Sequence, residues 1–511
     1  MTAQTIRPAD PLSLLTADRR QRDLDQLRGG QTVDVLVIGG GVTGVGVALD
    51  AATRGLDVAL IEAHDFAFGT SRWSSKMVHG GLRYLASGKV GVAWESAVER
   101  ATIARYIAPH LVHPFAQLVP IFNDTSRKEL LATRAGLAAG DVLRRASRLP
   151  KSRLPGPSRI DSSRARDLVP GIASESLRGA FVSWDFKLED DARFVVSIAR
   201  TAAAYGAKLI TRARATSVSP SGAVVTDALT GDEFTINARH VINATGVWAG
   251  SLDPEIELTP SRGTHLVVPA ELLGNPRASL AVPVPGHFGR FVFTIPQFDD
   301  VVYIGLTDVP APGPIPDVPK PDSDEVEWIL GIINLGLDTA INRSDVLGTF
   351  SGLRPLVADP TGHDSTADIS RHHLVTGGPG EVVTVTGGKL TAYRRMAQDA
   401  VDRISDVPCR THRIALVGSG PAQSTSELPP RLVRRFGAEA AAVAALADGD
   451  PALLQPLSPA IHSPVLAVEV LWAQQAEGAL DVEDVIERRT RISLVPDDAR
   501  VVHNHITALM A

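Results

Sequence analysis

A glycine-rich turn near the start of the chain is the feature that most directly indicates a chemistry. Residues 39–44 read GGGVTG, which has the spacing of a GxGxxG motif. Gly39 permits a tight turn, Gly41 lets the backbone approach a pyrophosphate, and Gly44 lets a helix pack closely on a sheet. Unpaired N–H groups at the start of that helix would face the phosphates. The turn therefore predicts a dinucleotide site.

An acidic residue follows at the position where a ribose would be bound. Glu62 ends the next apolar run after the turn, as the motif requires. Its carboxylate would accept hydrogen bonds from a free 2′-hydroxyl and would repel a 2′-phosphate, so FAD or NAD is expected and NADP is not. The alternative interpretation is a structural turn followed by a surface glutamate.

A strand, a helix and a second strand are needed to position these residues. Residues 33–38 (VDVLVI) form a short apolar run that ends in glycines, which is typical of a parallel strand buried on both faces. Residues 42–55 predict the helix, and residues 58–62 predict the second strand of a βαβ unit.

The rest of the chain predicts a mixed fold. Residues 290–295 and 301–305 flank two aspartates and predict an antiparallel hairpin. Beyond residue 429 the sequence becomes rich in Ala and Leu, with helical patterns over 431–446 and 465–479. Further strands are expected at 207–210, 215–218 and 240–243.

Composition narrows the class of protein. The 511 residues, of which 44% are hydrophobic and 21% charged with a formal net charge of −6, fit an ordinary globular enzyme of two or three domains. Cys409 is the only cysteine, which excludes an intramolecular disulfide and a cysteine-built metal site, and favours a reducing, cytoplasmic setting. The first 32 residues are polar, and no apolar run of about 18 residues follows, so any membrane contact is expected to be peripheral.

Three further glycine-containing blocks favour FAD over NAD. They are SSKMVHGGLRY (74–84), NATGVW (243–248) and TGGKLT (386–391). Turns of small residues this far apart in the sequence suit a long cofactor that is contacted by the backbone along its length.

With those residues in view, the chain resembles the FAD-dependent glycerol-3-phosphate dehydrogenase family, which includes aerobic, quinone-linked bacterial enzymes. The resemblance runs from the 39–44 turn into the C-terminal region, and the order and spacing of the blocks carry it. The blocks are SSKMVHGGLRYL (74–85), APH (108–110), DDAR (190–193), INATGVWA (242–249), RGTHLVVP (262–269), IGLTD (304–308), GLRPL (352–356), TGGKLTAYR (386–394) and VEDVIERRTRISL (482–494).

The resemblance implies a fold that is α/β plus α+β. A Rossmann-like FAD-binding domain would combine with a substrate domain built on an antiparallel sheet, as in D-amino-acid oxidases, and with a helical C-terminal cap. The implied boundaries are 30–105, 190–255 and 350–405 for the FAD-binding domain, 106–189 and 256–349 for the substrate domain, and 411–511 for the cap.

The resemblance also assigns the reacting groups. Oxidising a secondary alcohol needs a base for the hydroxyl proton while hydride leaves the carbon. His265 matches the active-site histidine of the family, and Arg354 matches a residue that contacts the substrate. Because arginine rarely loses its proton, His265 is favoured as base and Arg354 as electrostatic partner, although the assignment stays open. Without the resemblance, His265 would more often be a structural residue.

A phosphorylated substrate needs cationic side chains. Arg83, Arg371 and Lys389 match cationic positions of the family site, where they would hold the phosphate dianion. Tyr84 would add a phenolic hydrogen bond, and its alternative is a packed core aromatic. Each cation taken alone would more often be a solvated surface charge.

The expected flavin contacts extend well beyond the first turn, and no His/Asp/Glu spacing of a metal site emerges. The expected contacts are Gly39, Gly41, Val42, Thr43, Gly44, Glu62, Thr70, Ser74, Ser75, Lys76, His79, Gly80, Gly81, Leu82, Ala244, Gly246, Gly388, Lys389, Leu390 and Thr391.

The electron acceptor is not fixed by the sequence. The family resemblance favours the quinone pool, and the alternative is oxygen, with hydrogen peroxide as product. Residues 127–166 carry eleven Lys or Arg against three Asp or Glu, so they are expected either to contact an anionic membrane on the cytoplasmic side or to form a solvated face. A homodimer is an open alternative.

A flavin-holding protein that binds or modifies RNA is the hypothesis from another class. Such a protein would need a strongly basic domain or a groove rich in aromatic side chains, and aromatic residues make up only 5% of this chain. No nucleic-acid partner is therefore expected, and glycerol 3-phosphate is the expected substrate by resemblance.

Overall fold

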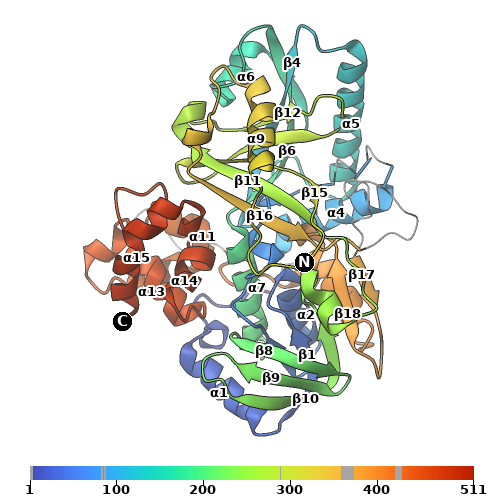
Figure 1. The fold of residues 1–511 in the computed structure, drawn as a ribbon, viewed down its shortest axis with the longest axis vertical. Coiled ribbons are helices and arrows are strands. Elements are labelled where there is room, and N and C mark those ends of the chain that lie inside the picture. Colours follow the sequence, from blue (N-terminus) through green and yellow to red (C-terminus); the bar gives the residue numbers. More distant parts are fainter. Residues whose placement is uncertain (1–3, 82–83, 86–87, 288, 358–372, 421–427) are drawn as a thin grey trace.

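The computed structural model describes residues 4–81, 84–85, 88–287, 289–357, 373–420 and 428–511. Within them the chain forms two sheets, and helices of the C-terminal region lie beside both (Figure 1). No helix in this part of the chain is both long and apolar enough to cross a membrane.

The first sheet contains the predicted βαβ unit. The strand β1 (Thr32–Ile38) pairs in parallel with β2 (Val58–Ile61) on one side and with β10 (Glu233–Asn243) on the other. Between β1 and β2 runs α2 (Val42–Thr53), which packs against α10 (Tyr393–Val401). The prediction of strand, helix and strand is confirmed, with ends within two residues.

The sheet has eight strands in the described residues, in the order β17-β18-β10-β1-β2-β7, and β9 pairs with β10 while β8 pairs with β9. Because β10 pairs with β9 over 233–237, it begins well before the predicted 240–243. The other strands are β7 (Lys208–Ile210), β8 (Ala213–Ser219), β9 (Gly222–Asp227), β17 (His373–Thr376) and β18 (Val383–Gly387).

The second sheet is mainly antiparallel. Its order is β15-β11-β14-β13-β12-β4-β6-β3, with β16 beside β11 and β5 beside β6. The predicted hairpin is confirmed as β13 (Phe291–Pro296) and β14 (Val301–Gly305). The remaining strands are β3 (Met77–Val78), β4 (Val112–Phe122), β5 (Ser158–Ile160), β6 (Leu177–Leu188), β11 (Ser261–Pro269), β12 (Ser279–Pro283), β15 (Val309–Pro310) and β16 (Gly348–Arg354).

Helices cover the two sheets and form the C-terminal region. The two sheets and these helices confirm the expected combination of a Rossmann-like unit, an antiparallel sheet and a helical C-terminal part; the exact domain boundaries stay a prediction. The remaining helices are α1 (Ala17–Arg28), α4 (Val90–Thr102), α5 (Arg127–Ala146), α6 (Ser162–Leu168), α7 (Asp191–Ala204), α8 (Ala249–Leu252), α9 (Ser323–Ile333), α11 (Pro430–Phe436), α12 (Ala440–Ala445), α13 (Ala467–Ala476), α14 (Val482–Asp484) and α15 (Pro496–Met510).

The prediction of one helix over 431–446 is wrong in its middle. Gly437 has φ +55°, and a Cβ there would lie 2.2 Å from the carbonyl oxygen of Gly418. The chain therefore leaves α11 at Phe436, makes a short 3₁₀ turn, and starts α12 at Ala440. An Ala-rich pattern conceals such a break because one glycine barely alters the helical periodicity.

Buried ion pairs join the C-terminal region to the first sheet. Asp65 is fully buried and accepts hydrogen bonds from Arg488 at 2.6 Å and from Arg489 at 2.8 and 2.9 Å. Burial by itself would raise the pKa of Asp65, but Arg489 and Arg488 outweigh it and hold the pKa at about 2. A buried carboxylate paired in this way is costly to replace.

We expect the substitution Asp65→Asn to lower the free energy of unfolding at pH 7 by about 3–5 kcal/mol, because the buried Arg489 loses its counter-charge and Arg488 keeps only its pairs with Asp484 and Glu487. Since the folded pKa lies below the ordinary one, this contribution is present above about pH 4 and is lost as the pH falls through about 2. The gap between wild type and variant should therefore shrink in acid.

Urea unfolding at several pH values measures this gap. Asp497→Asn is the control, because its pair with Arg500 is exposed and worth at most about 1 kcal/mol. Equal destabilisation by both substitutions would contradict the assignment.

Candidate active site

A cavity of about 1940 Å³ receives most of the residues that the sequence singled out. It starts at the turn between β1 and α2, passes β11 and β16, and ends between α5 and the hairpin β12–β13. Its volume exceeds the 300–1,000 Å³ of most small-molecule sites, so it has room for more than one ligand.

The glycine turn forms one end of this cavity, and glycine is required at two of its positions. Gly39 has φ +111°, and a Cβ there would lie 2.7 Å from the carbonyl oxygen of Ala244. A Cβ on Gly44 would lie 1.8 Å from the carbonyl oxygen of Gly39, so the helix could not pack. Gly41 lines the cavity and immediately precedes α2. The backbone at the start of α2 therefore lies open to a ligand.

Glu62 lines the cavity beside this turn. Its carboxylate accepts a hydrogen bond from the N–H of Gly40 at 2.6 Å and another from the N–H of His64 at 2.8 Å. Burial raises the pKa of Glu62, and the two backbone hydrogen bonds partly offset the rise. The side chain is thus fixed where it can accept hydrogen bonds from ribose hydroxyls.

Two glycines form a second backbone contact farther along the cavity. Gly387 and Gly388 both have positive φ, +80° and +68°, and a Cβ on Gly388 would lie 2.5 Å from the sulfur of Met396. Lys389, Leu390 and Thr391 follow them along the cavity wall, where the chain turns into α10.

The predicted flavin contacts fall into two groups. Gly39, Gly41, Val42, Thr43, Glu62, Thr70, Ser74, Ser75, His79, Ala244, Gly246, Gly388, Lys389, Leu390 and Thr391 line the cavity. Backbone from β1–α2, from the end of β10 and from the end of β18 therefore lies along its length. Such an arrangement fits a flavin dinucleotide.

Four predicted contacts do not line the cavity. The Lys76 ammonium is buried and pairs with Asp191 at 3.0 Å, and Gly44 serves the packing of α2. Gly80 donates its N–H to Asp185, and Gly81 packs on α4. Leu82 lies outside the described residues, as do Arg83 and Arg371.

His265 projects from β11 into the cavity wall while remaining 1% exposed. Its Nε2 lies 2.9 Å from the Ser75 hydroxyl, and its ring stacks on Phe350 with centroids 4.7 Å apart. Nδ1 has no hydrogen-bond partner in the described part of the chain. Burial, followed by the charges of Lys76 and Arg354, lowers the pKa of His265 to about 3. The imidazole is therefore neutral at physiological pH.

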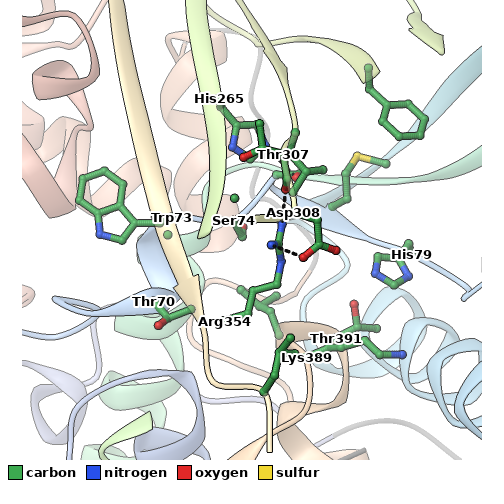
Figure 2. Close-up of a pocket in the computed structure, with 18 of the residues that line it drawn as sticks. Thr70, Trp73, Ser74, His79, His265, Thr307, Asp308, Arg354, Lys389 and Thr391 are labelled. Atoms are coloured by element: carbon green, nitrogen blue, oxygen red, sulfur yellow. Dashed lines mark hydrogen bonds and ion pairs between the residues drawn. The ribbon is translucent and has the colours of Figure 1, made fainter. Parts of the chain in front are cut away.

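Arg354 ends β16 and points into the same space (Figure 2). Its guanidinium donates to the hydroxyl of Ser261 at 3.1 Å, to Asp308 at 3.3 Å and to the carbonyl oxygen of Thr307 at 3.2 Å. The side chain crosses Gly263, where a Cβ would lie 2.3 Å from Nη2. Glycine at 263 is therefore required for the arginine to reach the cavity.

A buried carboxylate fixes the segment after β14 that contains Thr307 and Asp308. Glu325, on α9, accepts hydrogen bonds from the hydroxyls of Thr307 at 2.7 Å and Thr264 at 3.1 Å, and from Arg262 at 2.7 Å. Because the carbonyl oxygen of Thr307 also accepts from Arg354, the position of the guanidinium depends on this network.

Lys389 brings a second cation into the cavity. Its ammonium donates to Ser96 at 2.7 Å and lies 3.8 Å from the centre of the Tyr84 ring. Figure 2 shows Lys389 and Thr391 below Arg354, with His265 above it. The structure therefore brings together His265, Arg354, Lys389 and Tyr84 from four separate segments of the chain.

Sequence reasoning missed several residues that shape the site. Ser71 caps α2 by accepting the N–H of Val42 at 2.9 Å, and Asp308 pairs with Arg354. Trp248 lines the cavity against Gly69. Asp308 and Trp248 stand inside two of the blocks that carried the resemblance, so their position was the available signal. No group of three or more metal-ligating side chains occurs among the described residues.

We expect the substitution Gly39→Ala to weaken FAD binding at least tenfold, which is about 1.4 kcal/mol, because the new methyl group meets the Ala244 carbonyl. The ratio of flavin to protein absorbance after gel filtration, together with FAD titration, measures this. Gly206→Ala is the control, since Gly206 also has positive φ but no described atom lies within 4 Å of its Cβ. Equal FAD content in both variants would contradict the role of the turn.

Comparison with known proteins gives this cavity a family context. Residues 34–394 match the family described as "FAD dependent oxidoreductase", and residues 409–511 match the "C-terminal domain of alpha-glycerophosphate oxidase". "Glycerol-3-phosphate dehydrogenase 1" of Mycobacterium tuberculosis is 49% identical over 95% of this chain and 96% of its own length.

More distant relatives agree. "Probable glycerol-3-phosphate dehydrogenase, mitochondrial" of Caenorhabditis elegans is 34% identical over 94% of this chain and 72% of its own length. The glycerol-3-phosphate dehydrogenase of Bacillus halodurans, solved with FAD, is 25% identical with a TM-score of 0.73, and the match covers 97% of this chain and 94% of that one. The chain therefore belongs to the FAD-dependent glycerol-3-phosphate dehydrogenase family.

Proposed function

We propose that this chain oxidises sn-glycerol 3-phosphate to dihydroxyacetone phosphate and passes the electrons to a quinone. The observation that carries the proposal is the placement of His265, Arg354 and Lys389 around one space beside the dinucleotide turn. A neutral imidazole and two cations suit an alcohol that carries a phosphate dianion. The bound flavin supplies the hydride acceptor.

The cationic side chains hold and orient the substrate. Lys389 and Arg354 both line the cavity, and Arg83, Arg371 and Tyr84 are proposed to complete the phosphate site. Asp308 offsets part of the charge of Arg354, and the planar guanidinium directs its N–H groups at fixed angles. We assign Arg354 to polarise the C2 hydroxyl.

His265 accepts the hydroxyl proton in this scheme. Its pKa of about 3 reflects a site that is buried and cationic. The incoming phosphate dianion brings the opposite charge close to Arg354 and Lys389, which line the cavity, and this raises the pKa of the imidazole. His265 is therefore activated as a base only when substrate is present, and Ser75 fixes the orientation of its ring.

An apolar arm of the cavity supports a quinone as acceptor. It runs between α5 and β12–β13, and an aromatic head group with an isoprenoid tail fits such a lining. Oxygen, which would give hydrogen peroxide, needs no such arm. The apolar side chains of the arm include Val119, Ile121, Phe122, Leu130, Leu137, Val284, Phe291 and Phe293.

The helix α5 that walls this arm also presents a surface for a membrane. Leu131 and Val142 are 67% and 63% exposed, and basic side chains flank them. Arg144 is excluded from this face, because it is buried and bonded to Asp141 and Leu149. We propose that α5 rests on an anionic leaflet at the cytoplasmic side, so that quinone enters from the bilayer. A homodimer stays a prediction.

We expect anaerobic glycerol 3-phosphate to bleach the flavin absorbance of the wild-type protein. His265→Gln should slow bleaching about 10²–10⁴-fold with FAD still bound, which is the usual contribution of a general base. Arg354→Lys should also slow it, because lysine cannot donate to Asp308 and the substrate in a planar fork. His240→Gln is the control, since His240 is not among the residues that line the cavity. Unchanged bleaching in both site variants would overturn the assignment.

We expect the substrate-reduced flavin to be reoxidised at least about tenfold faster by a short-chain quinone than by air, with little peroxide. Phe291→Ala should raise the KM for the quinone and leave bleaching by substrate unchanged. Fast reoxidation in air with stoichiometric peroxide would instead identify an oxidase.

We expect the protein to co-sediment with anionic liposomes through α5. Binding that survives the double substitution Leu131→Asp with Val142→Asp would exclude a role of this helix.

A further inference from the structure

Arg491 belongs to the C-terminal region and contacts residues 72–73, which immediately precede the cavity residues Ser74 and Ser75. It is 7% exposed, and its Nη2 donates to the carbonyl oxygen of Arg72. Its Nε lies 3.4 Å from a carboxylate oxygen of Asp190 and 4.0 Å from one of Asp191. The guanidinium also lies 5.2 Å from the centre of the Trp73 ring. Arg491 therefore contacts the backbone of Arg72, the ring of Trp73 and the acidic residues at the start of α7.

Asp191 carries this contact onward to the cavity. Its other carboxylate oxygen accepts hydrogen bonds from the N–H and hydroxyl of Ser74, at 3.0 and 2.8 Å, and pairs with the Lys76 ammonium at 3.0 Å. Lys76 also donates to the carbonyl oxygens of Arg72 and Ser74. One buried carboxylate thus fixes the backbone on both sides of Ser75.

Ser75 lies between these two anchored residues and touches His265. Its hydroxyl lies 2.9 Å from Nε2 of the imidazole, and both side chains line the cavity. Lys76 additionally lies 4.8 Å from the centre of the Phe350 ring on which His265 stacks. The orientation of His265 therefore depends on a contiguous chain of contacts that begins at Arg491.

Two residues in this series of contacts have a left-handed backbone conformation. Lys76 and Arg491 are non-glycine residues with φ +52° and +67°. Such conformations are strained in residues other than glycine and persist only where the surroundings enforce them. Both residues are buried cations that face Asp191, so the strain is tied to the same ionic cluster.

We propose that Arg491 of the C-terminal region is a positioning residue for His265, acting through Asp191 and the 74–76 segment. The inference rests on the proposed function of the cavity. It gives the C-terminal region a part in turnover, because a residue of that region, and not the two sheets alone, holds the 74–76 segment in place. Removing the guanidinium frees Asp191 from one cation and releases the carbonyl oxygen of Arg72.

Arg491→Gly is the decisive variant, because glycine accepts φ +67° without strain and only the side chain is lost. We expect kcat to fall about 10–100-fold, since a displacement of about 1 Å at a reacting group has effects of that size. The KM for glycerol 3-phosphate should change less than about threefold, and FAD content should stay the same.

Two controls separate positioning from general stability. Arg212→Gln removes partly buried ion pairs of the same junction, to Asp481 and Asp484, without touching residues 72–76, and should leave kcat within about twofold. Arg491→Lys keeps the charge but cannot make all the contacts of the guanidinium, so its kcat should lie between those of wild type and Arg491→Gly.

A double-mutant cycle tests the route through the imidazole. In a His265→Gln background, adding Arg491→Gly should lower kcat less than about twofold further, because the group that it positions is already gone. An equal loss in both backgrounds, or a kcat of Arg491→Gly that matches Arg212→Gln, would overturn the proposal. If Arg491→Gly does not fold, the same cycle with Arg491→Lys decides between these outcomes.

Failure of the proposed function would look different. In that case wild-type protein would not be bleached by glycerol 3-phosphate at all. If wild type is bleached and the Arg491 variants turn over normally, the cavity assignment stands and the positioning role falls.

Discussion

Pairing between buried arginines and buried carboxylates is the constraint on which this structure depends. Arg200 and Arg489 are among its largest fully buried side chains, and each finds its carboxylate across the junction between the C-terminal region and the rest of the chain. Arg200 pairs with Glu439, and Arg489 pairs with Asp65. An unpaired buried charge is strongly destabilising, so these pairs disfavour any placement of the C-terminal region that would separate an arginine from its carboxylate. The ion pairs therefore constrain the geometry of the junction.

That fixed geometry suits a site assembled from distant segments. The cavity takes its turn from β1–α2, its histidine from β11, its arginine from β16 and its lysine from the start of α10. Strand pairing places His265 opposite both Gly305 and Phe350, which gives the ring a narrow slot. At such a site the protonation state of a side chain is set mainly by its neighbours, as the lowered pKa of His265 shows.

Sequence reasoning succeeded for residues whose roles depend on neighbours close in the sequence, and it did not reach contacts between distant segments. The Gly39 turn and Glu62 were found because their roles follow from spacing within one βαβ unit. The sequence did not predict the partner of Arg354, because Asp308 comes close to it only through the pairing of β11 with β15 and β16. The break at Gly437 was missed for the same reason, because it exists only where Gly418 lies against it. The ion pair of Lys76 could not be predicted either, because Asp191, which holds its ammonium, is distant in the sequence.

The buried pair of Asp65 with Arg488 also has a consequence for how the protein is made. The two residues are 423 positions apart in the chain. While the ribosome is still synthesising the intervening sequence, Asp65 has no guanidinium to neutralise it, and domains generally fold as they emerge. Asp65 can therefore be buried as a paired carboxylate only after Arg488 and Arg489 have been synthesised, so the environment of this residue is completed late.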